Sequence, residues 1–385
     1  MGGGGKQSML TIHVGLHKTG STALQHTLSS MTKKELAGTI YRGAMSAAMN
    51  DGFMSFEPDS FGFRAAPARV PTVKHLRSGH DVVLSDEGFL GNAMIPEVGW
   101  VYRDANARAL GMLDYFGDLT PFLVVLYVRP QHAWLESLYV QRVKWGWMTG
   151  RIDANEFAEK MMRAPFFRWS RLVEALLDAV GPDRLVVRPH VRSVDVSSDF
   201  LSLLNLNLPP RLRQQRSVNV SPTPQWVSLR SRIWELSQSL GPDNALYWMD
   251  LVAGENQNAG TTTFSYFPED VQARSIETAT SDWFELATLV ERTQRADPEL
   301  FLQSAKRLRG SLPKPYLGGL DEMCLDKEAT YLVTKLLPYI RSHPKFLPLR
   351  LSGLARRARF QLVTDPTNAV GAALTYARRR IKYLR

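Results

Sequence analysis

A short segment near the start of the chain, GLHKTGST at positions 15–22, carries the residue types of an anion-binding loop. It runs from an apolar, strand-like segment into a helical one, so its backbone N–H groups would converge at the positive end of the helix dipole. Gly15 and Gly20 let the backbone approach an anion closely. Three side chains add donors: Lys18, Ser21 and Thr22. The segment is therefore predicted to cradle a phosphate or a similar oxyanion.

The order of residues in this loop differs from that of a Walker A loop, which places Lys and then Ser or Thr directly after its second glycine. Here Lys18 precedes Gly20, and the hydroxyl residues follow the glycine. A metal-binding acid is not clearly supplied, although Asp86, after VVLS, could imitate one. A P-loop-type nucleotide-dependent kinase therefore stays only as an alternative.

A second candidate anion site follows FLVVLYV at 122–128, a continuous apolar run typical of a strand buried on both faces of a parallel sheet. The run ends in Arg129 and Pro130, and Ser137 lies on the helix predicted to open at the proline. An arginine guanidinium is a permanently charged, bidentate partner for phosphate, and a serine hydroxyl is a further donor. The chain thus has two candidate phosphate sites.

These features together resemble sulfotransferases that use 3′-phosphoadenosine 5′-phosphosulfate (PAPS). The order Lys-Thr-Gly-Ser-Thr resembles the 5′-phosphosulfate loop of these enzymes, and the fuller string GLHKTGSTALQ looks like the form found in bacterial members and in the glycan-modifying branch. The string LESLYVQ also looks like the bacterial branch, and the resemblance covers about residues 10–205. It implies a P-loop-NTPase-like fold, with the 3′-phosphate bound by Arg129 and Ser137. The residues implied to bind the 5′-phosphosulfate are His17, Lys18, Thr19, Gly20, Ser21 and Thr22.

Transfer to an alcohol needs a base for the acceptor proton and stabilisation of charge on the leaving oxygen. The string VVLSDEGF places two acids at the end of a predicted strand, where open α/β sheets bind ligands. Because the glycan-modifying branch uses Glu at the comparable place, we predict Glu87 as the base and Lys18 as the group that stabilises the leaving oxygen. Asp86 and His17 are the alternative bases, and the two acids could instead only cap the following turn.

The resemblance implies in-line transfer of a sulfuryl group from PAPS to a hydroxyl acceptor, a glycan or a lipid-linked glycan, with the bisphosphate PAP as product and no metal required. A non-catalytic nucleotide- or polyanion-binding module is the other alternative. Four aromatic residues near the second motif either pack in the core or wall the adenine or acceptor: Trp134, Tyr139, Trp145 and Trp147. A basic cluster either closes over the 3′-phosphate or is solvated: Arg211, Arg213 and Arg216.

The elements that must position these residues alternate between strand and helix in the first half of the chain. This alternation predicts an α/β fold, a three-layer parallel sheet flanked by helices, with a mainly helical C-terminal half. Strands are expected at 10–16, 81–85, 122–128 and 185–188. Helices are expected at 22–30, 130–147, 166–180, 224–240, 268–293 and 326–340.

The composition is that of a globular protein: 385 residues, 44% hydrophobic and 22% charged, which excludes disordered, collagen-like and coiled-coil classes. One cysteine, Cys324, excludes an internal disulfide framework and a Cys-based zinc cluster. A reducing, cytoplasmic location is therefore expected. Four segments are expected: a tag or disordered start at 1–9, the PAPS-binding core at 10–215, a helical acceptor-side extension at 216–345, and a basic amphipathic tail at 346–385.

The net charge of +10 is concentrated at the C-terminus, where 350–385 holds nine basic residues and one acid, Asp365, so that the rest of the chain carries only +2. The main body is therefore not expected to bind polyanions generally or nucleic acid specifically. In the tail, apolar residues recur at helical spacing opposite a basic face. Such a helix would contact the anionic inner membrane surface, or it is a docked or solvated C-terminal helix.

Overall fold

The computed structural model describes most of the chain between residues 8 and 316. The described ranges are 8–42, 72–91, 94–95, 100–117, 121–145, 154–191, 194–213, 265–295 and 297–316. The predicted helices at 224–240 and 326–340, the tail at 346–385, and Trp147 and Arg216 lie outside them. No helix in these ranges is long and apolar enough to cross a membrane.

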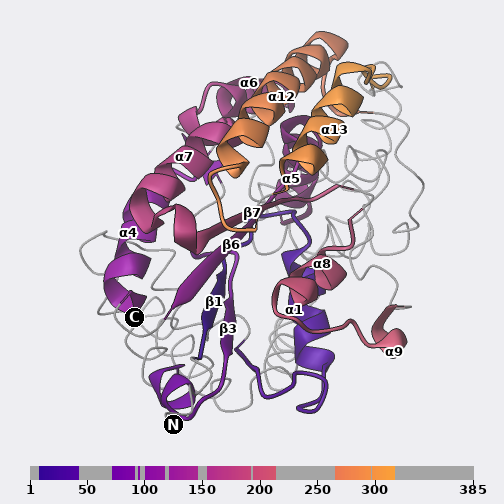
Figure 1. Ribbon diagram of the computed structural model, residues 1–385. Coiled ribbons are helices and arrows are strands. Elements are labelled where there is room, and N and C mark those ends of the chain that lie inside the picture. Colours follow the sequence, from indigo (N-terminus) through magenta and orange to yellow (C-terminus); the bar gives the residue numbers. More distant parts are fainter. Residues whose placement is uncertain are drawn as a thin grey trace, which may run out of the picture.

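In the described part of the chain, five parallel strands form one sheet with the order β2-β3-β1-β6-β7 (Figure 1). Strand β1 is central, and its last residue, His13, pairs with Ser85 of β3 on one side and with Val125 of β6 on the other. The strands are β1 (Leu10–His13), β2 (Ile40–Arg42), β3 (Val82–Ser85), β6 (Phe122–Val128) and β7 (Leu185–Pro189). Because all of these strands run in the same direction, their carboxyl ends meet at one edge.

The sheet is covered on both faces, and the side chains of β6 show why. Alternate residues of a strand point to opposite faces. Val124, Leu126 and Val128 pack into one hydrophobic cluster with the helices on one face of the sheet. The intervening residues of β6 pack into a second cluster with the helices on the other face. A strand buried on both faces must be apolar throughout, which explains FLVVLYV.

The helices form the two outer layers, with α1 and α8 side by side on one face and α4 and α7 on the other (Figure 1). The helices are α1 (Ser21–Ser30), α4 (Ala105–Phe116), α5 (Gln131–Trp145), α6 (Ala154–Met162), α7 (Trp169–Val180), α8 (Val196–Leu203), α9 (Pro210–Arg213), α12 (Glu269–Val290) and α13 (Pro298–Arg309). Two short strands, β4 (Met94–Ile95) and β5 (Trp100–Val101), pair separately as an antiparallel ribbon.

The predicted α/β class is confirmed, a three-layer arrangement around a parallel sheet. The expected strand at 122–128 matches β6 at both ends, and the expected strand at 81–85 is β3. The helix expected at 166–180 begins later, at Trp169, because Pro165 opens a short 3-10 turn (Pro165–Phe167) before it. Strand β2 was not predicted, because three residues at the edge of a sheet leave too short a pattern.

Helices α12 and α13 belong to the same core as the sheet. Trp283 of α12 and Phe301 of α13 are fully buried, with ring centroids 5.3 Å apart, and both join the cluster that covers β6. After α12, the Gln294 N–H donates to the Leu185 carbonyl at the start of β7, at 2.8 Å. These two helices are therefore part of the same hydrophobic core as the sheet.

Phe301→Ala is expected to lower the free energy of unfolding by about 3–5 kcal/mol, because it opens a cavity beneath Trp283. Lys306→Ala, an exposed position on the same helix, is the matched control and is expected to stay within about 0.5 kcal/mol of the wild type. Urea unfolding followed by circular dichroism and tryptophan fluorescence measures both. A separate early transition for α13, with the main transition unmoved, would contradict a shared core.

Candidate functional site at the carboxyl edge of the sheet

The loop between β1 and α1 folds back tightly on itself. Lys18 and Gly20 both adopt a positive φ, 66° and 84° respectively. A Cβ on Gly15 would lie 2.2 Å from the Ser21 hydroxyl oxygen, so only glycine fits there. The Thr19 hydroxyl is buried and donates to the Leu16 carbonyl at 2.6 Å, so it closes the loop from within.

This loop delivers the chain into the N-terminus of α1 with Gly20 as the N-cap. The first N–H groups of a helix have no partner within the helix, and the helix dipole makes that end positive. The first turn of α1 contains no acidic side chain, and Thr22 is exposed there. The geometry therefore presents donors and positive charge together, as the sequence predicts.

The structure brings the second anion motif into direct contact with the first. Arg129 follows the last residue of β6, and its Nη1 donates to the Lys18 carbonyl at 3.3 Å. The two motifs, far apart in sequence, thus share one place at the sheet edge. Ser137 is half-buried on α5, two turns along the helix that starts beside Arg129.

Two buried tryptophans hold the backbone of both motifs. The Trp134 indole N–H donates to the His17 carbonyl at 2.9 Å, and the Trp169 indole N–H donates to the Arg129 carbonyl at 2.6 Å. Their rings pack edge to face, with centroids 5.0 Å apart and planes at 88°. Trp134, one of the aromatic residues that sequence left between core and ligand wall, is fully buried and so belongs to the core.

Tyr102 holds the middle of the loop, and no motif in the sequence pointed to it. Its side chain is buried, and its hydroxyl lies 2.7 Å from the His17 backbone nitrogen, which donates to it, and 3.1 Å from His17 Nδ1. Burial raises the pKa of the Tyr102 hydroxyl well above its usual range, and the nearby Glu87 carboxylate adds to this rise. Tyr102 therefore stays neutral and fixes the loop as a hydrogen-bonding partner of His17.

Glu87 is half-buried and lies close enough to Lys18 to be influenced by its charge. Burial, and after it the charge of Asp86, raises the pKa of the Glu87 carboxyl to about 7, while Lys18 and the Ser21 hydroxyl act in the opposite direction. A carboxyl group with this pKa can exchange a proton near neutral pH, which is what a general base requires. Asp86 differs: its Oδ1 accepts the Gly88 N–H at 2.6 Å and so caps the turn after β3.

Two histidines that sequence reasoning did not single out also lie at this edge. His13 is fully buried and shares a 2.8 Å hydrogen bond between its Nδ1 and the Ser85 hydroxyl, and burial lowers its pKa to about 3. His190 follows β7, and its N–H donates to the Val128 carbonyl at 2.6 Å. A Cβ added to Gly20 would lie 3.4 Å from His190 Nε2, which places this imidazole against the start of α1.

His190 is neutral in this setting. Burial lowers its pKa to about 4, and the charge of Arg129 contributes to the same shift. Its place directly after a strand of the parallel sheet was the available signal, since carboxyl ends of such strands gather at the ligand-binding edge.

Arg211, the first residue of the late basic cluster, lies away from this edge. The Arg211 guanidinium donates to the Ser30 carbonyl at 2.8 Å and pairs with Glu35 at 2.6 Å. These partners lie at and beyond the C-terminal end of α1, the end opposite to the anion cradle. Arg211 therefore stabilises the C-terminal end of α1, and of the two alternatives left open for the cluster, its partners do not support closure of this residue over a phosphate.

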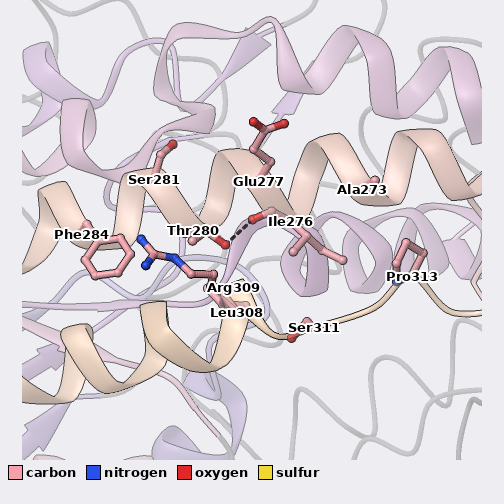
Figure 2. Close-up of a pocket in the computed structure, with 10 residues that line it drawn as sticks. All are labelled: Ala273, Ile276, Glu277, Thr280, Ser281, Phe284, Leu308, Arg309, Ser311 and Pro313. Carbon is pink, nitrogen blue, oxygen red and sulfur yellow. Dashed lines mark hydrogen bonds between the residues drawn. The ribbon is translucent and has the colours of Figure 1, made fainter.

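A separate groove of about 600 Å³ lies along α12 and α13 (Figure 2). Its lining includes Ile276, Phe284 and Leu308, and the Arg309 guanidinium lies 4.9 Å from the centre of the Phe284 ring. None of the residues predicted for nucleotide binding or catalysis lines it. In the ranges that the structure describes, no group of three or more His, Cys, Asp or Glu is arranged to hold a metal ion.

Similarity to known proteins is found among solved structures and not among sequence families. No protein-family model matches the chain, and no curated protein sequence matches it. The fold is similar to that of a sulfotransferase from Alicyclobacillus acidocaldarius, with a TM-score of 0.34 and 14% identity, over 63% of this chain and 95% of that one. Because the identity and the TM-score are this low, the chemistry of the site is inferred from the residues of this chain alone.

Glu87→Gln is expected to stabilise the protein more at pH 8 than at pH 5. The wild-type carboxyl titrates near 7 when folded and near 4.5 when unfolded, so the folded state loses stability as pH rises between these values. Glutamine does not titrate, so above pH 7 the free energy of unfolding of Glu87→Gln should exceed that of the wild type by up to about 3 kcal/mol from this effect. Urea unfolding at the two pH values measures it.

The matched control for this experiment is Glu291→Gln, an exposed glutamate just after α12, which is expected to show the same small effect at both pH values. An equal effect of Glu87→Gln at pH 5 and pH 8 would mean that the Glu87 carboxyl titrates normally.

Proposed function

We propose that this protein is a sulfotransferase that moves the sulfuryl group of PAPS to a hydroxyl acceptor. The observation that carries the proposal is the contact between Arg129 and the Lys18 carbonyl, which joins two cationic motifs at one sheet edge. A ligand with phosphates at two positions suits such a pair better than a ligand with one. The resemblance of both motifs to PAPS-dependent enzymes, described above, gives the identity of that ligand.

The residues around the cradle fit an anionic nucleotide. The first turn of α1 offers backbone donors and contains no acidic residue of its own, and Gly20 leaves open the space where a side chain would meet His190. In this proposal the loop residues His17 to Thr22 hold the 5′-phosphosulfate. Arg129 and Ser137 hold the 3′-phosphate, with the guanidinium as a bidentate clamp.

The proposed chemistry uses Glu87 and Lys18. PAPS supplies a sulfuryl group on a phosphate leaving group. Glu87 takes the proton of the acceptor hydroxyl as the new oxygen–sulfur bond forms and the bond from sulfur to the bridging phosphate oxygen breaks. The Lys18 ammonium stabilises the negative charge that develops on that oxygen. The pKa of about 7 suits Glu87 to this role, because the carboxylate is available at neutral pH and still basic.

The acceptor and the cellular location are proposed on the resemblance and the composition. The Glu at the base position is typical of the glycan-modifying branch, so we infer a glycan or a lipid-linked glycan as the acceptor. The single cysteine favours the cytoplasm. The basic residues of 350–385 would bring the enzyme to the inner membrane surface, where a lipid-linked acceptor is found.

Calorimetric titration with PAP, without metal, is expected to show 1:1 binding that is tighter than binding of ATP with magnesium. Arg129→Ala is expected to weaken PAP binding by about 10- to 100-fold, because a charged hydrogen-bonding partner of the 3′-phosphate is lost. Arg171→Ala, an exposed arginine on α7, is the matched control and should bind PAP as the wild type does.

Tighter binding of ATP with magnesium would instead favour a P-loop-type kinase. Binding of neither nucleotide would leave the cradle without the ligand proposed here and would contradict the sulfotransferase function.

A further inference from the structure

The most completely enclosed carboxylate in the described structure lies outside both anion motifs. Asp282 of α12 is fully buried, and donors surround both of its oxygens. Oδ2 accepts the Trp169 N–H at 2.8 Å and a hydrogen bond from the Gln131 side-chain amide. Oδ1 accepts the Ser170 N–H at 3.1 Å and a hydrogen bond from the Ser170 hydroxyl. A buried carboxylate is stable only with such compensation.

These donors are the first residues of two helices. Gln131 begins α5, and Trp169 and Ser170 begin α7. The residue before α7, Arg168, makes no side-chain cap of its own. Asp282 therefore acts as a cap supplied from a distant part of the chain, satisfying N–H groups that α7 leaves open and placing negative charge at its positive end.

The first residues of both helices lie next to Arg129, the residue proposed to bind the 3′-phosphate. Gln131 is two residues after Arg129, and the Trp169 indole N–H donates to the Arg129 carbonyl at 2.6 Å. The Trp283 indole N–H, next to Asp282, donates to Gln131 Oε1 at 3.2 Å, which turns the amide nitrogen of Gln131 toward the carboxylate. Asp282 thus binds two neighbours of Arg129: Gln131, which is close to it in the chain, and Trp169, which donates to its carbonyl.

We propose that Asp282 is a positioning residue for the 3′-phosphate: by fixing the starts of α5 and α7 it sets the place of Arg129, so that the C-terminal part of the chain determines recognition of that phosphate. This inference rests on the proposed function. Both Asp282 oxygens face hydrogen-bond donors, so both must accept. An asparagine side chain has only one oxygen, and its NH2 group would point its hydrogens at the donors on the other side. Asparagine is therefore an almost equal-sized substitution that removes the arrangement.

The test is the ratio of the dissociation constants for AMP and PAP, measured by calorimetry on the full chain. These nucleotides differ only in the 3′-phosphate, so the ratio reports how well Arg129 is placed and does not depend on the fraction of folded protein. Asp282→Asn is expected to lower the ratio about tenfold through weaker PAP binding, with AMP binding unchanged.

A control separates positioning from general loss of stability. Leu286→Ala removes a fully buried side chain one turn further along α12 and is expected to lower the melting temperature while keeping the wild-type ratio. Trp169→Phe keeps a ring but removes the indole N–H that reaches Arg129, so it is expected to lower the ratio as Asp282→Asn does. It decides the question if Asp282→Asn does not fold.

An unchanged ratio in the folded Asp282→Asn or Trp169→Phe protein would overturn the inference and leave the proposed function standing. A fall of equal size in Leu286→Ala would also overturn it, since destabilisation alone would then explain the effect. A wild-type protein that binds AMP and PAP equally would refute the proposed function itself.

Discussion

Two hydrogen bonds from indole N–H groups to loop carbonyls hold the functional edge together. A buried tryptophan must place its one polar group against an acceptor. Here Trp134 donates to His17 and Trp169 donates to Arg129, one carbonyl in each anion motif. Lys18 and Arg129 carry like charges, so their own electrostatics would separate the motifs. The packed indole pair opposes that repulsion and holds the two motifs together in the structure.

The carboxylate at the same edge shows the opposite relation between stability and chemistry. Glu87 is partly removed from water and lies next to Asp86, and both influences disfavour its ionised form. That arrangement destabilises the folded protein at neutral pH, and it raises the basicity of the carboxylate, as the proposed role of Glu87 as a base requires. Asp86 instead caps the turn after β3, because its Oδ1 accepts the Gly88 N–H. The two adjacent acids therefore differ in setting, and only Glu87 is proposed to take part in the chemistry.

The sequence predicted those features that depend on local pattern. The apolar run of β6 and the glycine-bearing loop before α1 each impose their geometry on the residues around them. Sequence reasoning missed Tyr102, His190 and Asp282, because each acts on partners far away in the chain and none is part of a local repeat. Arg211 illustrates the converse: a basic cluster in a loop left open whether it contacts a phosphate or solvent, and only tertiary packing shows that Arg211 pairs with Glu35. The long-range partners follow from the topology of the sheet, which no short motif contains.

A crystal structure with PAP bound tests the central claim, that the two motifs form one nucleotide site, most directly. The 5′-phosphate is expected on the loop from His17 to Thr22 at the N-terminus of α1. The 3′-phosphate is expected against the Arg129 guanidinium, with the indole pair unmoved. PAP bound elsewhere, or bound at the loop with its 3′-phosphate away from Arg129, would contradict that claim.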